Sequence, residues 1–182
     1  RSQGSYALGR GFRDIGLEDA RIYNFDACGR GDTLVVSTAA DELLRGSEGA
    51  GADRALHALR SLRVRLLRTA RALSLRRVLL MPTPFSDDAG FFAAGLAAQT
   101  ITVLPEVEAE RLAARLRGKP ALAAQLVNRE AEKSAGLSGR LGPLLPRTWK
   151  DLNTARDTPE TLRPELFPTI TALACGLCAG TE

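Results

Sequence analysis

The sequence predicts an α/β fold in which a central mixed, mostly parallel sheet is flanked by helices on both faces. Short β-rich runs alternate along the chain with helical segments, which is the signature of βαβ units and a largely parallel sheet. Apolar residues make up 45% of the 182 residues but aromatic residues only 5%, a composition that suits close packing of helix on sheet. A chain of this length can bury one full core, so residues 1–182 are expected to form a single domain.

Four runs along the chain are expected to be strands. The segments "RIYNF" and "TLVVS" are rich in β-formers and flank the turn-forming "CGRGD", and Asp26 ends the first of them. The run "RRVLLMPTP" is apolar and is ended by prolines, which predicts a buried strand. The run "QTITVLP" predicts the next strand.

Helices are expected between and after these strands. From Asp53 to Leu75, Leu and Ala recur every three or four residues, and Asp53 is expected to be the N-cap. "FSDDAGFFAAGLAA" reads as a polar loop and a short helix. One or two helices are expected over 106–138, with Pro120 marking a start or a break. A closing helix is expected over 158–180, with Thr158 as cap and a proline in its first turn.

Charge and apolar content limit the classes of partner. Basic residues outnumber acidic ones by 25 to 21, and this small excess does not favour nucleic-acid binding. The arginines of the 53–75 helix are read as its solvated face in preference to a phosphate-binding stripe, and the single His57 on that helix is read as structural in preference to a ligand. No apolar run reaches the roughly 18 residues of a membrane span.

The three cysteines do not indicate a disulfide framework. Cys175 and Cys178 have CxxC spacing in an apolar run without a second pair of cysteines. A core helix that carries two small apolar thiols is the favoured interpretation, ahead of redox or metal chemistry.

Four segments, in this order, resemble the C-terminal half of the co-catalytic zinc aminopeptidases, the family of bacterial leucyl aminopeptidases with glutaminyl cyclases as relatives. They are "GSYAL", "YNFDACGRGD", "PFSDDAGFFAAGLAAQTITVLP" and "LNTARDTPETL". In the family these positions follow the catalytic Glu-Glu, carry a zinc-binding Asp, carry Ser-Asp-His, and carry a final His-Thr-x-x-Asp-Thr. The resemblance covers nearly the whole chain and implies a zinc-peptidase-like fold.

The resemblance implies a metal site with specific residues. Asp26 aligns with a zinc ligand, while Asp87, Asp88 and Asn153 fall in the substrate pocket. Two alternatives stay open, because an Asp before a Gly-rich turn is ordinary and Asp87 and Asp88 suit equally well as caps of the helix that starts near Ala89. Two positions depart from the family, because Asn153 replaces the final metal-binding imidazole and Asp88 replaces the His of Ser-Asp-His. Asp157 is expected to cap or orient the loop around Asn153. By the family's spacing, the Glu-Glu and the upstream His-x-Asp would lie ahead of Arg1, so the chain is expected to be the C-terminal portion of a longer domain.

Three functional hypotheses remain open from the sequence. The first is a zinc-dependent aminopeptidase-type metallopeptidase that hydrolyses a peptide or small-molecule substrate, with Asp26 as a ligand. The second is a catalytically inactive relative that keeps the fold as a binding module, which Asn153 favours because an amide oxygen is a weak zinc ligand. The third is an arginine-rich surface that acts on nucleic acid. Either a missing N-terminal half or a second copy of the chain could complete the molecule, and this chain alone is expected to hold no tight zinc.

Overall fold

Four strands form one mixed sheet at the centre of the computed structural model, which describes residues 3–44, 50–84, 86–127, 143, 145–152 and 154–179. The strands are β1 (Ile22–Phe25), β2 (Thr33–Ser37), β3 (Val78–Met81) and β4 (Ala98–Leu104), and their order in the sheet is β1-β4-β2-β3. β1 pairs parallel with β4, β2 pairs parallel with β3, and β2 runs antiparallel to β4. The predicted mixed sheet is confirmed.

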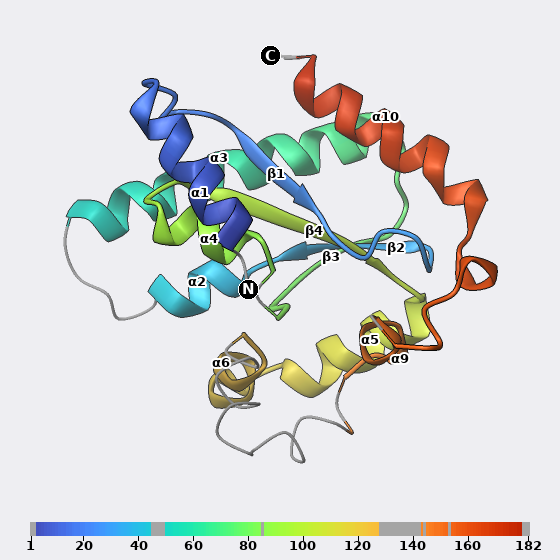
Figure 1. Ribbon diagram of the computed structural model, residues 1–182. Coiled ribbons are helices and arrows are strands. Elements are labelled where there is room, and N and C mark those ends of the chain that lie inside the picture. Colours follow the sequence, from blue (N-terminus) through green and yellow to red (C-terminus); the bar gives the residue numbers. More distant parts are fainter. Residues whose placement is uncertain are drawn as a thin grey trace.

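Helices cover both faces of the sheet (Figure 1). On one face lie α3 (Ala50–Ala72) and α10 (Phe167–Cys178), whose Leu66 and Leu173 are fully buried against β2 and β4. On the other face lie α5 (Glu106–Leu116), α6 (Pro120–Val127) and α9 (Arg147–Asp151). The alternation of side chains along β2 divides the core, because Val35 packs toward α5 while its neighbours in β2 pack toward α3.

A smaller apolar cluster closes the end of the sheet where β1 and β4 begin. There α1 (Gln3–Asp14) packs on α4 (Asp88–Ala93), and Phe91 and Leu96 are buried against the first residues of β1 and β4. α1 contains the "GSYAL" segment of the resemblance. Short helix α2 (Ala39–Leu44) follows β2 directly. Among the described helices, none combines the length and apolar content that crossing a bilayer demands.

Several predicted elements need correction at their ends. α3 begins at Ala50, so Asp53 lies in its first turn and is not its N-cap. β3 is an edge strand with Leu80 48% exposed, so it is not the buried strand that its apolar sequence predicts. α5 and α6 divide ahead of Pro120 as expected, whereas 128–138 lies outside the described residues.

The closing segment is not one helix. Two 3-10 turns, η2 (Pro159–Thr161) and η3 (Pro164–Leu166), precede α10, and Arg163 has φ −116° and ψ 89°, as suits a residue before proline. Thr158 stands ahead of η2 and makes no side-chain capping bond.

The cysteines of α10 also differ from the prediction. Cys175 and Cys178 are exposed, because α10 turns Leu173 and Leu177 toward the sheet and these thiols lie on other faces of the helix. They are therefore not core residues.

Candidate functional site

The loop that follows β1, Asp26–Asp32, runs along the end of the neighbouring strand β4. The backbone N–H of Asp26 donates to the carbonyl of Ile101 (2.9 Å), and that of Asp32 donates to the carbonyl of Leu104 (3.2 Å). Gly31 has φ +106°, and a Cβ there would lie 2.1 Å from the carbonyl carbon of Leu104. Only glycine fits this close approach of two backbones, which explains the "GRGD" turn.

The loop begins with a strained residue. Ala27 has φ +53°, which places a residue with a Cβ in the left-handed region immediately after Asp26. Its carbonyl accepts hydrogen bonds from Val103 N (3.5 Å) and Thr102 Oγ1 (3.4 Å), and these bonds hold the strained conformation. Backbone strain of this kind gathers at functional sites, where surrounding contacts stabilise it.

A cluster of uncharged polar groups joins β1, β4 and the turn ahead of α4. Asn24 Nδ2 donates to Ser86 Oγ (3.2 Å) and to Thr100 Oγ1 (3.2 Å). Asn24 and Thr100 are adjacent across the parallel pair, and Ser86 comes from a segment 62 positions away from Asn24 in the sequence. The cluster thus fixes the Ser86–Asp88 turn to the end of β1.

Asp88 is the buried carboxyl group of this cluster, with 2% of its surface exposed. Its Oδ1 accepts the backbone N–H groups of Ser86 (2.9 Å) and Ala89 (3.1 Å). Burial raises the pKa of Asp88, the hydrogen bonds from Ser86, Thr100 and Ala89 act in the opposite direction, and the nearby charge of Asp26 raises it further. Asp26 and Asp88 are therefore close enough to influence one another.

The carboxylate of Asp26 is half-buried beside the cluster around Asp88. Within the described residues, no side chain forms an ion pair with it or donates a hydrogen bond to it. The neighbouring Cys28 is half-buried, and its partial burial together with the charge of Asp26 raises the pKa of its thiol to about 12. Cys28 therefore stays protonated at neutral pH in the metal-free chain, and Asp26 is a charged group without a side-chain partner among the described residues.

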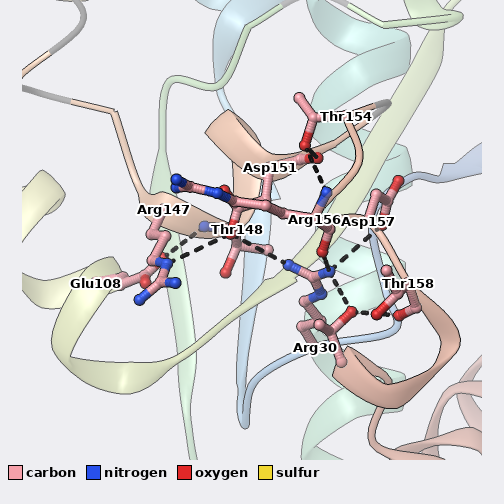
Figure 2. A network of polar contacts seen from close by, with 10 residues as sticks. Arg30, Glu108, Arg147, Thr148, Asp151, Thr154, Arg156, Asp157 and Thr158 are labelled. Atoms are coloured by element: carbon pink, nitrogen blue, oxygen red, sulfur yellow. Dashed lines mark hydrogen bonds and ion pairs between the residues drawn. The ribbon is translucent and has the colours of Figure 1, made fainter.

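On the other side of the loop lies an ionic cluster built on Arg30 (Figure 2). Arg30 Nη2 donates to the carbonyl of Arg156 (3.0 Å) and to Thr161 Oγ1, and it lies 3.5 Å from Asp157 Oδ1. Its Nη1 lies 3.7 Å from Asp151 Oδ2. One arginine therefore ties the loop after β1 to a segment more than 120 positions later in the sequence.

Asp151 is the buried anion of the ionic cluster, with 7% of its surface exposed. Besides Arg30, Arg147 Nε (3.4 Å) and Arg156 Nη1 (3.9 Å) approach its carboxylate. Thr154 Oγ1 donates to the backbone carbonyl of Asp151 (2.6 Å), and this bond shapes the turn that follows α9. Figure 2 shows these side chains converging from α9 and from the segment after it.

The four residues of the predicted site differ in where they lie in the structure. Asp26 and Asp88 lie near each other. Asp87 is exposed and precedes α4 without a side-chain capping bond. Asn153 lies outside the described residues. Asp157 pairs with Arg30, and its expected role in orienting the loop around Asn153 stays a prediction.

Three residues of this region were not recognised from the sequence alone. Asn24 lies between two aromatic residues and Thr100 lies between Gln99 and Ile101, and a polar side chain on a strand indicates a solvent face as readily as a buried cluster. Arg30 falls in a Gly-rich turn, where an arginine is ordinary. Its partners lie so far along the chain that no local pattern links them.

The described side chains around Asp26 offer few ligands for zinc. In the part of the chain that the structure describes, no group of three or more His, Cys, Asp and Glu side chains is placed to hold a metal ion. Oδ1 of Asp88 already accepts hydrogen bonds from two backbone N–H groups, and Asp26 alone cannot make a tetrahedral site. The described residues therefore do not form a complete zinc site by themselves.

Comparison with known proteins adds no assignment. A scan of protein-family models, a search of curated proteins and a search of solved structures each found no match to this chain. The resemblance to zinc aminopeptidases thus stays a prediction from the sequence, and the α/β fold is the conclusion that the structure supports.

Proposed function

We propose that this chain is the C-terminal portion of a zinc-dependent aminopeptidase-type hydrolase, in which Asp26 supplies one carboxylate ligand. The further ligands that zinc requires come from outside the described residues. In such a hydrolase the metal activates water for attack on a peptide carbonyl. In this proposal, the chain holds Asp26 at the end of β1 with its carboxylate available to bind zinc.

One observation carries the proposal: three segments of the resemblance meet around the loop after β1. The Ser86–Asp88 turn reaches it through Asn24, 62 positions away, and the segment after α9 reaches it through Arg30, 126 positions from Arg156. The carboxyl ends of parallel strands are where α/β proteins place their sites, and β1 ends here beside Ile101 of its parallel neighbour β4. The positive φ of Ala27 beside Asp26 supports the same location.

The test uses the natural chain that contains these residues together with any encoded ahead of Arg1. Zinc affinity and hydrolysis of an aminoacyl p-nitroanilide are measured for the wild type, Asn153→His and Asp26→Ala. We expect Asn153→His to raise zinc affinity by at least the roughly 10 to 100-fold typical of weaker, outer-shell changes, and to raise turnover with it. Asp26→Ala added to Asn153→His should cancel both gains, whereas Asp53→Ala, at an exposed residue of α3 outside the predicted site, should leave them in place. An active wild type that Asn153→His does not change contradicts this ligand assignment.

A second candidate is a catalytically inactive relative that binds a peptide or small molecule at the same place. The polar side chains bonded together beside Asp26 are an amide and two hydroxyls, from Asn24, Ser86 and Thr100, which suit hydrogen bonding better than zinc ligation. Inactivity of the wild type, Asn153→His and Asp26→Ala despite bound zinc would favour this candidate.

A further inference from the structure

A groove of about 660 Å³ lies between α3 and β1, on the face of the sheet opposite Asn24. Tyr23 forms part of its wall, and consecutive residues of a strand point to opposite faces, so the groove is separate from the candidate zinc site. A volume of this size matches a nucleotide-sized ligand.

Positive charge dominates the walls of this groove. Four arginines line it, Arg21, Arg60, Arg65 and Arg68, together with the exposed His57, and no Asp or Glu is among the described residues that line it. His57 thus lies at the groove and not among the leucines of the core. A concave surface that carries one sign of charge concentrates ligands of the opposite sign.

Part of the wall is held rigidly in place. Arg65 donates to the carbonyl of Leu177 in α10 through Nε (3.2 Å) and Nη2 (2.9 Å), and the Tyr23 hydroxyl donates to the carbonyl of Leu62 (3.2 Å). Burial raises the pKa of Tyr23, while the charges of Arg65 and Arg21 act in the opposite direction, which places both guanidinium groups near the phenol. The floor of the groove is therefore fixed and electropositive.

The other arginines of the groove differ from Arg65. Over the described ranges, the side chains of Arg21, Arg60 and Arg68 form no ion pair and no hydrogen bond, in contrast to Arg30, which is fully engaged. Arg60 and Arg68 are eight residues apart on α3, which corresponds to about 12 Å along a helix at 1.5 Å per residue. A chain of phosphates can span this distance, so that the two guanidinium groups contact separate phosphates of one ligand.

We propose that this groove binds a small ligand that carries two or more phosphate groups, held by Arg21, Arg60 and Arg68. The guanidinium fork matches phosphate oxygens in geometry, and Arg65 adds charge from the floor. This site is independent of the proposed hydrolase function. The common chemistry is the oligophosphate, whether it is inorganic or part of a nucleotide.

The test is calorimetric titration of the intact chain with inorganic phosphate, tripolyphosphate and ATP at low ionic strength. We expect one tripolyphosphate per chain, bound about tenfold or more tightly than phosphate, because each additional charge-assisted contact contributes more than 1 kcal/mol. A preference for ATP over tripolyphosphate would identify a nucleotide as the source, and equal affinity would identify the phosphate chain itself. Either result supports the site.

A matched pair of variants separates the groove from overall charge. Arg60→Gln with Arg68→Gln should lower tripolyphosphate affinity about tenfold or more. Arg71→Gln with Arg76→Gln removes the same charge from exposed arginines outside the groove and should change affinity less than about threefold under screening by salt. Equal losses in the two pairs would overturn the proposal. Binding of a single-stranded oligonucleotide that tripolyphosphate does not displace would also overturn it, in favour of a nucleic-acid surface.

Discussion

The two polar clusters beside the loop after β1 differ in the partners of their carboxyl groups. In the cluster around Asp88, uncharged donors surround a buried carboxyl group, and the nearby Asp26 keeps its carboxylate uncommitted. In the cluster around Asp151, arginines neutralise every carboxylate that they reach. The loop between them, Asp26–Asp32, belongs to both.

This difference indicates a division of labour. Buried carboxylates that pair with arginines stabilise one arrangement of the chain but are not available for chemistry. Two neighbouring carboxyl groups repel each other when both are ionised. A cation bound between them relieves this repulsion, so a carboxylate in such a pair remains able to bind one. The ionic cluster therefore positions the loop, and the Asp26 side of the loop is where we expect function.

The largest expected effect comes from the residue that lets the loop follow β4. Gly31→Ala forces a Cβ into the backbone of Leu104 and strains a φ of +106°, so we expect a loss of about 3 kcal/mol or more in the free energy of unfolding. Urea unfolding followed by the fluorescence of the single Trp149 measures it. Gly11→Ala on α1 is the matched control, because no atom lies within 4 Å of its added Cβ, and it should be neutral or stabilising. A Gly31→Ala variant as stable as Gly11→Ala would contradict this loop geometry.

The next effect tests the ionic cluster. Arg30→Gln removes the cation shared by Asp151 and Asp157, and the side chains of Arg30 and Asp151 are only 13% and 10% exposed. We expect a loss of about 2 kcal/mol, since a buried carboxylate loses a charged partner. Arg163→Gln breaks an exposed pair with Glu165 and should cost less than about 0.5 kcal/mol. Equal costs would show that Arg30 does not hold the segment after α9.

A smaller effect appears as a dependence on pH. Because the folded-state pKa of Asp88 lies above the ordinary value of 3.8, the folded protein binds this proton more tightly than the unfolded chain. The contribution of Asp88 to stability is therefore greatest below that ordinary value and falls as pH rises through the raised pKa. Asp88→Asn should remove this fall, while the exposed neighbour Asp87→Asn should retain it. Denaturation midpoints measured between pH 3.5 and neutrality test this expectation, which fails if the two variants behave alike.

The fold class could be predicted from the sequence, because the spacing of apolar residues and the local composition indicate which side chains of each segment are buried. The runs around Tyr23, Val35 and Ile101 are β-rich and became strands, and the 3.6-residue period predicted α3. The prediction of one closing helix was wrong because Pro164 and Pro168 each lie at the start of a new element, η3 and α10. The strand at Val78–Met81 was predicted to be buried because an apolar sequence does not reveal that a strand lies at the edge of the sheet.

The site was only partly predictable for a related reason. Asp26 and Asp88 were found through a resemblance that includes both positions, whereas Asn24, Thr100 and Arg30 act through contacts across distant segments. Such contacts depend on strand order, and β4 lying between β1 and β2 is not visible in any local pattern.

The most direct test of the central claim compares an uncommitted carboxylate with a paired one. Zinc affinity is measured by competition with a chromogenic chelator in the natural chain that includes any residues encoded ahead of Arg1, for the wild type, Asp26→Asn and Asp157→Asn. If Asp26 is a ligand, Asp26→Asn should weaken zinc binding by about 100-fold or more, and Asp157→Asn, whose carboxylate pairs with Arg30, should change it by less than about tenfold. Equal affinities in the wild type and Asp26→Asn would contradict the account.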